Sequence, residues 1–355
     1  MLTFQFLPAK HGDCFLVRWG KPERVMLVDG GPDQIFEKVL RPHLMLLPTQ
    51  PGKVPTVDVL CLSHVDEDHV IGVMLLLKEL ARAKRDQLPL PINVRRVWFN
   101  SVDDLVDKVQ PGLATSVRAL AKSAPANSAT GASYAQGGDV RSSVAALSLA
   151  GNPPFGGSLV AGATCKLDDL DVTVVGPTKQ GLANLAKKWQ AAVKTNNAQA
   201  VTASYKDYSV PNLSSIALHI RHLGRTALLT GDARGDHLIE GLEATKLLVT
   251  GANMKVDVFK LPHHGSNQNS PPSLFDRVRA DHYVISADGI KHKHPSPETL
   301  NWLVESRTKD EIYTIHLTNA IPVAQARLEE LRAGRKFNVA VGAPLVEIAL
   351  PAINK

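Results

Sequence analysis

A short apolar segment that runs directly into a dense polar cluster constrains this chain more than any other feature. Residues 56–63, TVDVLCLS, form a nearly continuous apolar run with β-branched residues, which is typical of a buried strand. The next six positions hold His64, Asp66, Asp68 and His69. An apolar pattern compatible with a helix, VIGVMLLLKELARA, starts immediately afterwards at residue 70. The polar cluster therefore stands where a buried strand leaves its sheet and a helix begins.

These four side chains favour metal chemistry. Imidazole and carboxylate groups together suit divalent ions such as Zn²⁺, Mn²⁺ and Fe²⁺. On an extended segment His64 and Asp66 point to the same side, and a turn into the helix directs Asp68 and His69 into a neighbouring volume. That arrangement serves two adjacent metal ions better than one. The alternative is a solvated helix N-terminus with capping aspartates, and this cluster alone does not exclude it.

Three further polar clusters follow predicted strands. LLTGDA places Asp232 after one strand, LPHHGS places His263 and His264 after another, and HKHPSP places His292 and His294 after a third. Taken singly, a capping aspartate or a surface histidine explains each cluster. Together, at strand ends of one chain, they predict a shared site. Adjacent histidines usually face different ways, so we expect one of the HHGS pair to bind metal and the other to face substrate.

Strand and helix patterns alternate along both halves of the chain, which predicts an α/β fold of layered sheets and helices. SSIALHIRHLGRTALLTGDA predicts a β-hairpin. The segment at about 100–165 differs, because SAPANSATGASYAQGG within it is rich in Ala, Ser and Gly and is expected to be a mobile insertion or loop, followed by a short helix at VRSSVAALSLAG, residues 140–151. We expect a single domain over residues 1–355 that carries this insertion. The separated Cys14, Cys61 and Cys165 are expected to be buried free thiols in a reducing compartment.

Composition limits the location and partners that we expect. No apolar run is long enough to span a bilayer, and the first residues lack the basic region and cleavage site of a signal peptide, so we expect a cytoplasmic protein. The formal net charge of +6 permits an anionic substrate without demanding one. The densest basic stretch, residues 81–96, is as compatible with a solvated helix end as with a nucleic-acid surface.

The motif order resembles that of the metallo-β-lactamase fold superfamily of hydrolases. VDGG, SHVDEDH, LLTGD, HHGS and HPS follow one another along the chain. Within that superfamily the chain is similar to the ComEC-type branch, typified by the hydrolase domain of the bacterial DNA-uptake channel. The segments HGDCFLV, SHVDEDHVIG, NLSSIALHI and LPHHGSNQNS carry this likeness. It runs from about residue 3 to residue 302 and leaves out about 100–165.

The resemblance implies a four-layer αββα sandwich with two divalent metal ions, Zn or Mn, at one edge of the sheets. The residues that it carries over as metal ligands are His64, Asp66, Asp68, His69, Asp232 and His263. His64 and Asp66 would bind the first ion, and Asp68, His69 and His263 the second. Asp232 would bridge the two ions. Asp29, in VDGG, would steady the metal loop from behind.

The chain departs from this family pattern in one respect. Many members supply a further histidine ligand between the SHxDxDH and TGD motifs, whereas here only His219 and His222 lie between them, within a predicted strand. We therefore expect the first metal ion to be poorly supplied with ligands and weakly bound.

The implied activity is hydrolysis by metal-activated water, above all of phosphodiester bonds, with nucleic acid as the first candidate substrate. Asp68 would orient the attacking group, and His264 or His294 would hydrogen-bond the developing oxyanion or protonate the leaving group.

Two alternatives remain open at the level of the sequence. One is a small-ester hydrolase of the phosphorylcholine-esterase type, with a cation cage built from Trp98, Phe99 or Trp302. The other is a catalytically weak regulatory subunit of a larger system, with a protein partner that the sequence does not identify.

Overall fold

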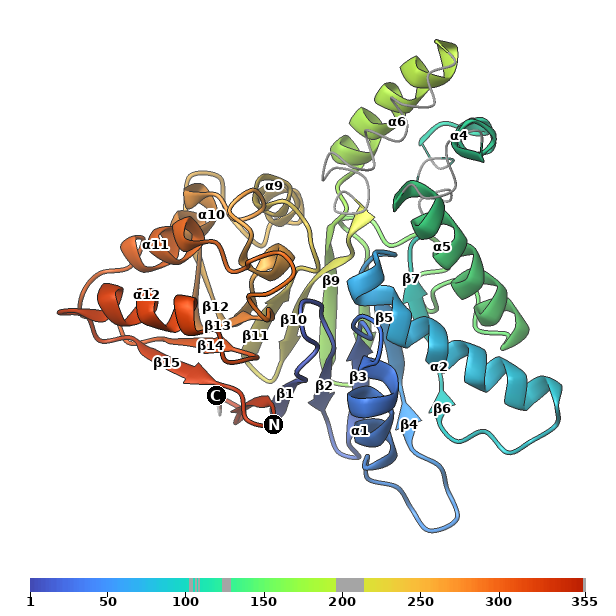
Figure 1. Ribbon diagram of the computed structural model, residues 1–355, viewed down its shortest axis with the longest axis horizontal. Coiled ribbons are helices and arrows are strands. Elements are labelled where there is room, and N and C mark those ends of the chain that lie inside the picture. The colour runs from blue at the N-terminus through green and yellow to red at the C-terminus, as the bar shows by residue number, and fades with distance from the viewer. Residues whose placement is uncertain (102–104, 106, 108, 123–128, 196–213, 354–355) are drawn as a thin grey trace.

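Two β-sheets face each other, and helices cover the outer face of each (Figure 1). The computed structural model describes residues 1–101, 105, 107, 109–122, 129–195 and 214–353. Among these residues the order of layers is helix, sheet, sheet, helix. The α/β fold class predicted from the sequence is confirmed.

The first sheet comes from the N-terminal part of the chain and its last strand. Its order is β16 (Val346–Leu350), β1 (Leu2–Phe6), β2 (Phe15–Trp19), β3 (Arg24–Val28), β5 (Val59–Leu62) and β7 (Val97–Phe99). The strands β16, β1, β2 and β3 are antiparallel neighbours, whereas β3, β5 and β7 run parallel. Parallel pairing needs crossover connections, which here contain η1 (Phe36–Leu40), α1 (Arg41–Met45) and α2 (Glu67–Arg85).

The predicted strand at 56–63 is interrupted at Asp58. Two residues of it form β4 (Thr56–Val57), which pairs with β6 (Asn93–Val94), and the rest forms β5. The buried Asp58 carboxylate accepts a hydrogen bond from the backbone N–H of Val25 and pairs with Arg24 and Arg95. Because a buried carboxylate needs such partners, this position joins β3 to β5 and β6 at the end of the sheet opposite to the polar clusters.

The second sheet comes from the C-terminal half. Its order is β15 (Asn338–Val341), β14 (Thr314–Leu317), β13 (Val278–Ile285), β12 (Met254–Lys260), β11 (Arg225–Leu229), β10 (Ala217–His222), β9 (Leu170–Gly176) and β8 (Thr164–Leu167). From β8 to β11 the pairing is antiparallel, including the predicted hairpin of β10 and β11, and from β11 to β15 it is parallel. The helical elements along this half are α9 (Gly235–Ala244), η2 (Pro262–Gly265), α10 (Pro272–Arg277), α11 (Pro297–Glu305) and α12 (Pro322–Arg332).

Apolar side chains fill three layers of core. The layer between the sheets includes Met26 and Cys61 from the first sheet and Leu218 and Val258 from the second. The other two layers lie under α2 and its neighbours and under α9 to α12. Strands with apolar side chains on both faces read as continuous apolar runs, which explains the pattern of residues 59–62.

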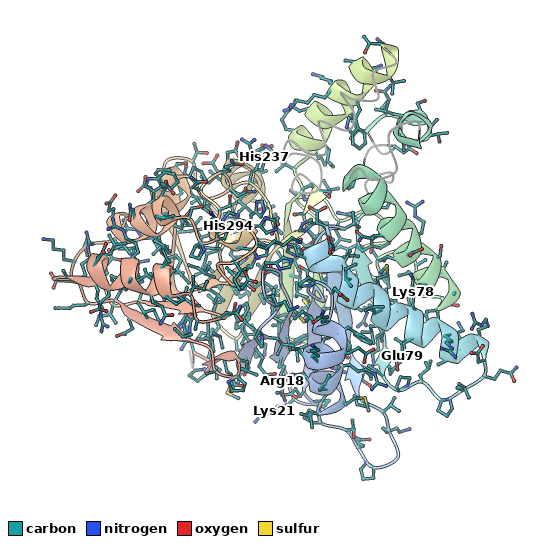
Figure 2. The ribbon with its side chains drawn as sticks, viewed as in Figure 1. Arg18, Lys21, Lys78, Glu79, His237 and His294 are labelled. Carbon is teal, nitrogen blue, oxygen red and sulfur yellow. The ribbon has the colours of Figure 1, made fainter. Side chains whose placement is uncertain are left out.

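The expectation of a loop is wrong for residues 129–138, which belong to helix α5 (Ala129–Ala146), whereas the short helix expected at 140–151 coincides with the end of α5. Val140 and Val144 on α5 are buried in the core layer that α2 also covers, and Lys78 (labelled in Figure 2) forms an ion pair with Asp139. Alanine is the best helix former, and burial of one face offsets the weak propensity of the glycines and serines.

Two further helices stand apart from the sheets. Figure 1 shows α4 (Leu113–Lys122) and α6 (Lys179–Lys194) side by side above the body of the molecule, and α6 was predicted from the sequence. The predicted loop at 195–210 lies outside the described residues except for Thr195. Cys14 and Cys61 are buried and Cys165 is half-buried, and all three are free thiols. None of the described helices combines the length and the apolarity that a bilayer crossing requires.

Candidate metal centre

Polar side chains from both sheets meet where the parallel strands end. The ends of β3 and β5 supply Asp29 and the segment 63–69, and the ends of β11 and β12 supply Asp232 and the pair His263–His264. Carboxyl ends of parallel strands share one edge of a sheet, and ligand sites form there in open α/β sheets. The clusters that the sequence analysis singled out therefore come together in space.

The carboxylate of Asp232 lies between two pairs of imidazole nitrogens. Its Oδ2 is 3.6 Å from Nε2 of His64 and 3.7 Å from Nε2 of His263. Its Oδ1 is 3.3 Å from Nε2 of His69 and 3.7 Å from Nε2 of His264. Each carboxylate oxygen thus faces its own pair of histidines.

One further carboxylate accompanies each pair. Asp66 Oδ2 is 3.7 Å from Nε2 of His64. Asp68 Oδ1 is 3.9 Å from Nε2 of His69, and its Oδ2 is 3.3 Å from Nε2 of His264. A tetrahedral metal site with bonds of about 2.0–2.2 Å separates its donor atoms by roughly 3.3–3.6 Å, which is close to these distances.

We call these two sets of donors the first group and the second group. The first group consists of His64, Asp66 and His263 with Oδ2 of Asp232. The second group consists of Asp68, His69 and His264 with Oδ1 of Asp232.

The outer nitrogens of His64 and His69 are fixed by one buried pair, Asp29 and Ser63. Asp29 Oδ1 accepts the backbone N–H of Ser63 and Oδ2 accepts its hydroxyl, both at 2.7 Å. Since that hydroxyl has given its proton to Asp29, it accepts from Nδ1–H of His64 at 3.0 Å. Nδ1–H of His69 donates to Asp29 Oδ2 at 2.8 Å. Both histidines therefore turn Nε2 toward Asp232, and in the neutral ring this nitrogen carries the lone pair.

The HHGS histidines are fixed in the same sense. His264 Nδ1 donates to the backbone oxygen of Ser286 at 2.7 Å. The Asn269 amide donates to the backbone oxygen of Asp232, so its Oδ1 accepts from Nδ1 of His263 at 2.8 Å. In the neutral form of each ring, all four histidines thus present an Nε2 lone pair to a carboxylate.

Lone pairs that face carboxylate oxygens repel one another unless a cation lies between them. Nε2 of His64, His69 and His264 and Oδ1 of Asp232 are also buried without a hydrogen-bond partner among the described residues. Buried polar atoms in proteins are almost always satisfied. The described groups that can hold a metal ion include one of His64, His69 and Asp232 and one of Asp68, His69 and His264. The residues present therefore fit divalent metal ions.

Burial and mutual charge shift the pKa values in the centre. Burial and the neighbouring His69 lower the pKa of His64 to about 3, which keeps its ring neutral. Burial alone would raise the pKa of Asp232, but the surrounding imidazoles, His69 foremost, hold it well below its usual value. Burial likewise opposes a charge on His69, yet the carboxylates of Asp232, Asp68 and Asp29 raise its pKa well above the usual value. The carboxylates thus strongly favour positive charge at this position.

The HHGS histidines occupy places other than those we expected. His263 was expected beside Asp68 and His69, and His264 toward substrate, but the structure puts His263 in the first group and His264 in the second. Both residues have left-handed backbone conformations, with φ of 47° and 56°, and these splay their rings apart.

His263 therefore stands where the first metal was expected to lack a histidine. His219 and His222 do not supply that ligand: both lie in β10, and His222 Nε2 is 2.9 Å from Asp169 Oδ2.

A buried ion pair behind the second group escaped the sequence analysis. Lys260, the last residue of β12, is fully buried, and its Nζ contacts the carboxylate of Asp13. Asp13 Oδ1 is 3.6 Å from Nδ1 of His264, and its Oδ2 is 3.8 Å from Nδ1 of His69. The only sequence signals were the HGD turn and a lysine at the end of an apolar strand.

His294 (labelled in Figure 2) lies beside the donor groups rather than among them. It lines a hollow with His11 and His292, which we call the mouth of the centre. Its ring centroid is 5.5 Å from that of His263, and burial lowers its pKa to about 4. His292 stacks on the outer side of His294, with 6.1 Å between the ring centroids.

The aromatic cage proposed for the small-ester alternative does not form. Trp98 is fully buried between the sheets, with its indole N–H donating to the backbone oxygen of Pro153. Phe99 and Trp302 pack against the two outer core layers.

One comparison with known proteins covers the first two motifs, VDGG and SHVDEDH. The family model described as the metallo-beta-lactamase superfamily matches residues 7–81, which include the segment 63–69. No curated protein matches the sequence.

Solved structures give weak likenesses. The metallo-beta-lactamase fold protein YhfI from Bacillus subtilis is 10% identical with a TM-score of 0.38, over 96% of both chains. CmlA, a diiron beta-hydroxylase from Streptomyces venezuelae, is 14% identical with a TM-score of 0.43, over 98% of this chain and 54% of CmlA. No conclusion about the site rests on these two. The match at residues 7–81 supports the metallo-β-lactamase superfamily, and the ComEC-type branch stays a prediction.

Proposed function

We propose that this protein is a metal-dependent hydrolase of phosphodiester bonds. The observation that carries the proposal is that four histidines turn their Nε2 atoms toward the two oxygens of one buried carboxylate, Asp232. A single shared carboxylate between two sets of nitrogen and oxygen donors suits a pair of divalent ions.

Each group would hold one ion, with Asp232 shared by both. The ligands of the first ion would be His64, Asp66 and His263, and those of the second Asp68, His69 and His264. With three aspartates among seven ligands the centre is rich in hard oxygen donors, so Mn²⁺ competes with Zn²⁺ as its metal.

When bound, the ions lower the pKa of water and offset negative charge on the attacked phosphoryl group. The protein's own residues orient and supply protons. Asp29, Ser63, Asn269 and the backbone oxygen of Ser286 hold the outer nitrogens of the four histidines, so that each Nε2 keeps its direction. Asp68, at the substrate side of the second group, would also orient the attacking water. Since His264 would be a metal ligand, the role that the sequence assigned to His264 or His294 is left to His294. Its ring would hydrogen-bond a phosphoryl oxygen or protonate the leaving oxygen.

Three points favour a phosphodiester as substrate. The motif order resembles a branch typified by a DNA-uptake channel, and the net charge is +6. The mouth is lined by His11, His292 and His294, whose imidazole N–H groups can donate hydrogen bonds to phosphate oxygens. The small-ester alternative loses its cation cage. The regulatory alternative does not explain why so complete a set of donors is held in orientation.

The test combines metal analysis with an activity screen. Protein purified without added metal is analysed for metal ions, then assayed on bis-p-nitrophenyl phosphate, single-stranded and duplex DNA, RNA and cyclic dinucleotides. We expect up to two divalent ions per chain, and activity that a chelator abolishes and Zn²⁺ or Mn²⁺ restores.

Asp68→Ala should lower activity by roughly 100-fold or more, because loss of a group that merely supports a ligand already costs about 10- to 100-fold. Asp310→Ala removes an exposed carboxylate elsewhere and serves as the control. Wild-type activity in Asp68→Ala would remove the assignment.

A further inference from the structure

The loop after β13 places a lysine, Lys291, near the mouth of the centre. The mechanism proposed above assigns no role to this lysine. Lys291 is exposed, and its Nζ is 3.2 Å from Nε2 of His11, which lies on the turn after β1. An ammonium group has donors only, so His11 Nε2 is the acceptor and its proton sits on Nδ1. That Nδ1 faces Asp288 Oδ2 at 3.9 Å. Asp288 and His11 together thus fix where the Lys291 ammonium group lies.

A row of imidazole rings connects this lysine to the candidate metal centre. The centroids of His11 and His292 are 5.7 Å apart, those of His292 and His294 6.1 Å, and those of His294 and His263 5.5 Å. His11, His292 and His294 line the same hollow. The row therefore leads from Lys291 to His263 of the first group.

The charge at the outer end of the row suits an anion. Asp288 is the carboxylate in the hollow, and it already faces His11. Burial lowers the pKa of His11, and the charge of the neighbouring Lys291 lowers it further, so the His11 ring favours its neutral form. Only one of the three N–H donors of the ammonium group points to His11, which leaves two for a phosphate oxygen.

We infer that Lys291, positioned by His11 and flanked by His292, binds a phosphate group next to the scissile phosphodiester. The inference rests on the proposed function and narrows its substrate class: the substrate is a strand with consecutive phosphates, not an isolated diester. Lys291 contacts the substrate, and His11 is a positioning residue.

The first experiment compares two substrates and two lysines on one loop. Thymidine trinucleotide has two phosphodiesters, and bis-p-nitrophenyl phosphate has one. Lys291→Met should raise KM for the trinucleotide about tenfold, the low end for a hydrogen bond to a charged group, and leave bis-p-nitrophenyl phosphate within about twofold. Lys293→Met, an exposed neighbour, is the control and should change neither. His11→Gln should reproduce part of the effect on the trinucleotide KM without lowering kcat.

Equal effects of Lys291→Met on both substrates, or equal effects of the two lysine variants, would overturn the inference. The same holds if a trinucleotide with a neutral methylphosphonate in place of the uncleaved linkage shows the full Lys291→Met effect.

A second experiment separates this inference from the proposed function, because it needs no turnover. Binding of a phosphorothioate trinucleotide to the metal-loaded protein is measured by calorimetry. Wild type should bind about tenfold more tightly than Lys291→Met, with Lys293→Met unchanged. If no phosphodiester is cleaved but this difference persists, the hydrolase proposal fails and the phosphate contact stands. If wild type and Lys291→Met bind the phosphorothioate trinucleotide with equal affinity, or if wild type does not bind it, Lys291 does not contact a phosphate of the substrate.

Discussion

The two donor groups of the centre share one carboxylate but differ in what stands behind them. In the second group, Nδ1 of His69 is held by Asp29, and Nδ1 of His264 by a backbone oxygen. The ion pair of Asp13 and Lys260 lies beside both rings. In the first group, Nδ1 of His64 is held by the Ser63 hydroxyl, and Nδ1 of His263 by the neutral amide oxygen of Asn269.

The two groups also differ in their access to solvent. The side chains of Asp66 and His263 are 31% and 15% exposed, whereas those of Asp68 and His264 are 16% and 1% exposed. Carboxylates behind a ligating histidine raise its basicity and fix its ring, and burial excludes competing water. We therefore expect the second group to bind its ion more tightly. We still expect the first ion to be the weaker one, but because its group is more exposed and the partners of its histidines are neutral, not because a histidine is missing.

The largest effect is expected where the groups meet. Asp232→Ala removes a ligand from both groups at once, so we expect both ions to be lost and activity to fall by about a thousandfold or more, equivalent to several kcal/mol of metal assistance. Elemental analysis and the phosphodiester assay measure the two losses. Retention of one tightly bound ion would show that the groups do not share Asp232.

The ion pair behind the second group should dominate the stability of the centre. Lys260→Met leaves Asp13 buried without its partner, and breaking such a pair costs about 3–5 kcal/mol of unfolding free energy. Denaturant unfolding in the presence of a chelator measures this without a contribution from bound metal.

The double variant Asp13→Asn/Lys260→Met removes the uncompensated charge and should recover part of the loss. If Lys260→Met alone unfolds at the wild-type denaturant concentration, the pair does not act as we describe.

His264→Ala and His263→Ala compare the groups directly. His264→Ala should release the tightly held ion, whereas His263→Ala should keep that ion and lose the weak one. Stepwise chelator competition, followed by elemental analysis, distinguishes the two. The reverse order of loss would invert the proposed ranking of the groups.

The sequence predicted the parts of the centre that depend on strand ends. A buried strand reads as an apolar run, and the polar residues that follow it must emerge at the sheet edge, so the clusters around His64, Asp232 and His263 were recognisable. The parallel pairing of β3 with β5 and of β11 with β12 then brings those ends to common edges.

The sequence did not predict which way each HHGS ring turns. That choice depends on two left-handed residues and on acceptors elsewhere in the chain, Asn269 for one ring and Ser286 for the other. Lys260 was missed because a lone lysine at the end of a strand usually reaches solvent, whereas here Asp13 from a distant turn covers it. The first part of helix α5, residues 129–138, was missed because its composition is typical of a loop, whereas the buried Val140 and Val144 lie in the part expected to be helical.

The smallest effect that we predict tests the weaker support of the first group. Asn269→Ala removes the acceptor that orients His263, together with a hydrogen bond to the backbone of Asp232. Loss of such a supporting partner lowers metal affinity by about 10- to 100-fold, and we expect the low end because the lost acceptor is neutral. Asp29→Asn replaces the charged partner of His69 and should reach the high end for the second ion, with a smaller loss at the first ion because Asp29 also holds the Ser63 hydroxyl beside His64. Titration of each metal-free variant with Zn²⁺ against a competing chelator gives both affinities. If Asn269→Ala weakens the second ion as much as the first, the two groups are supported as one unit and the difference between them is not real.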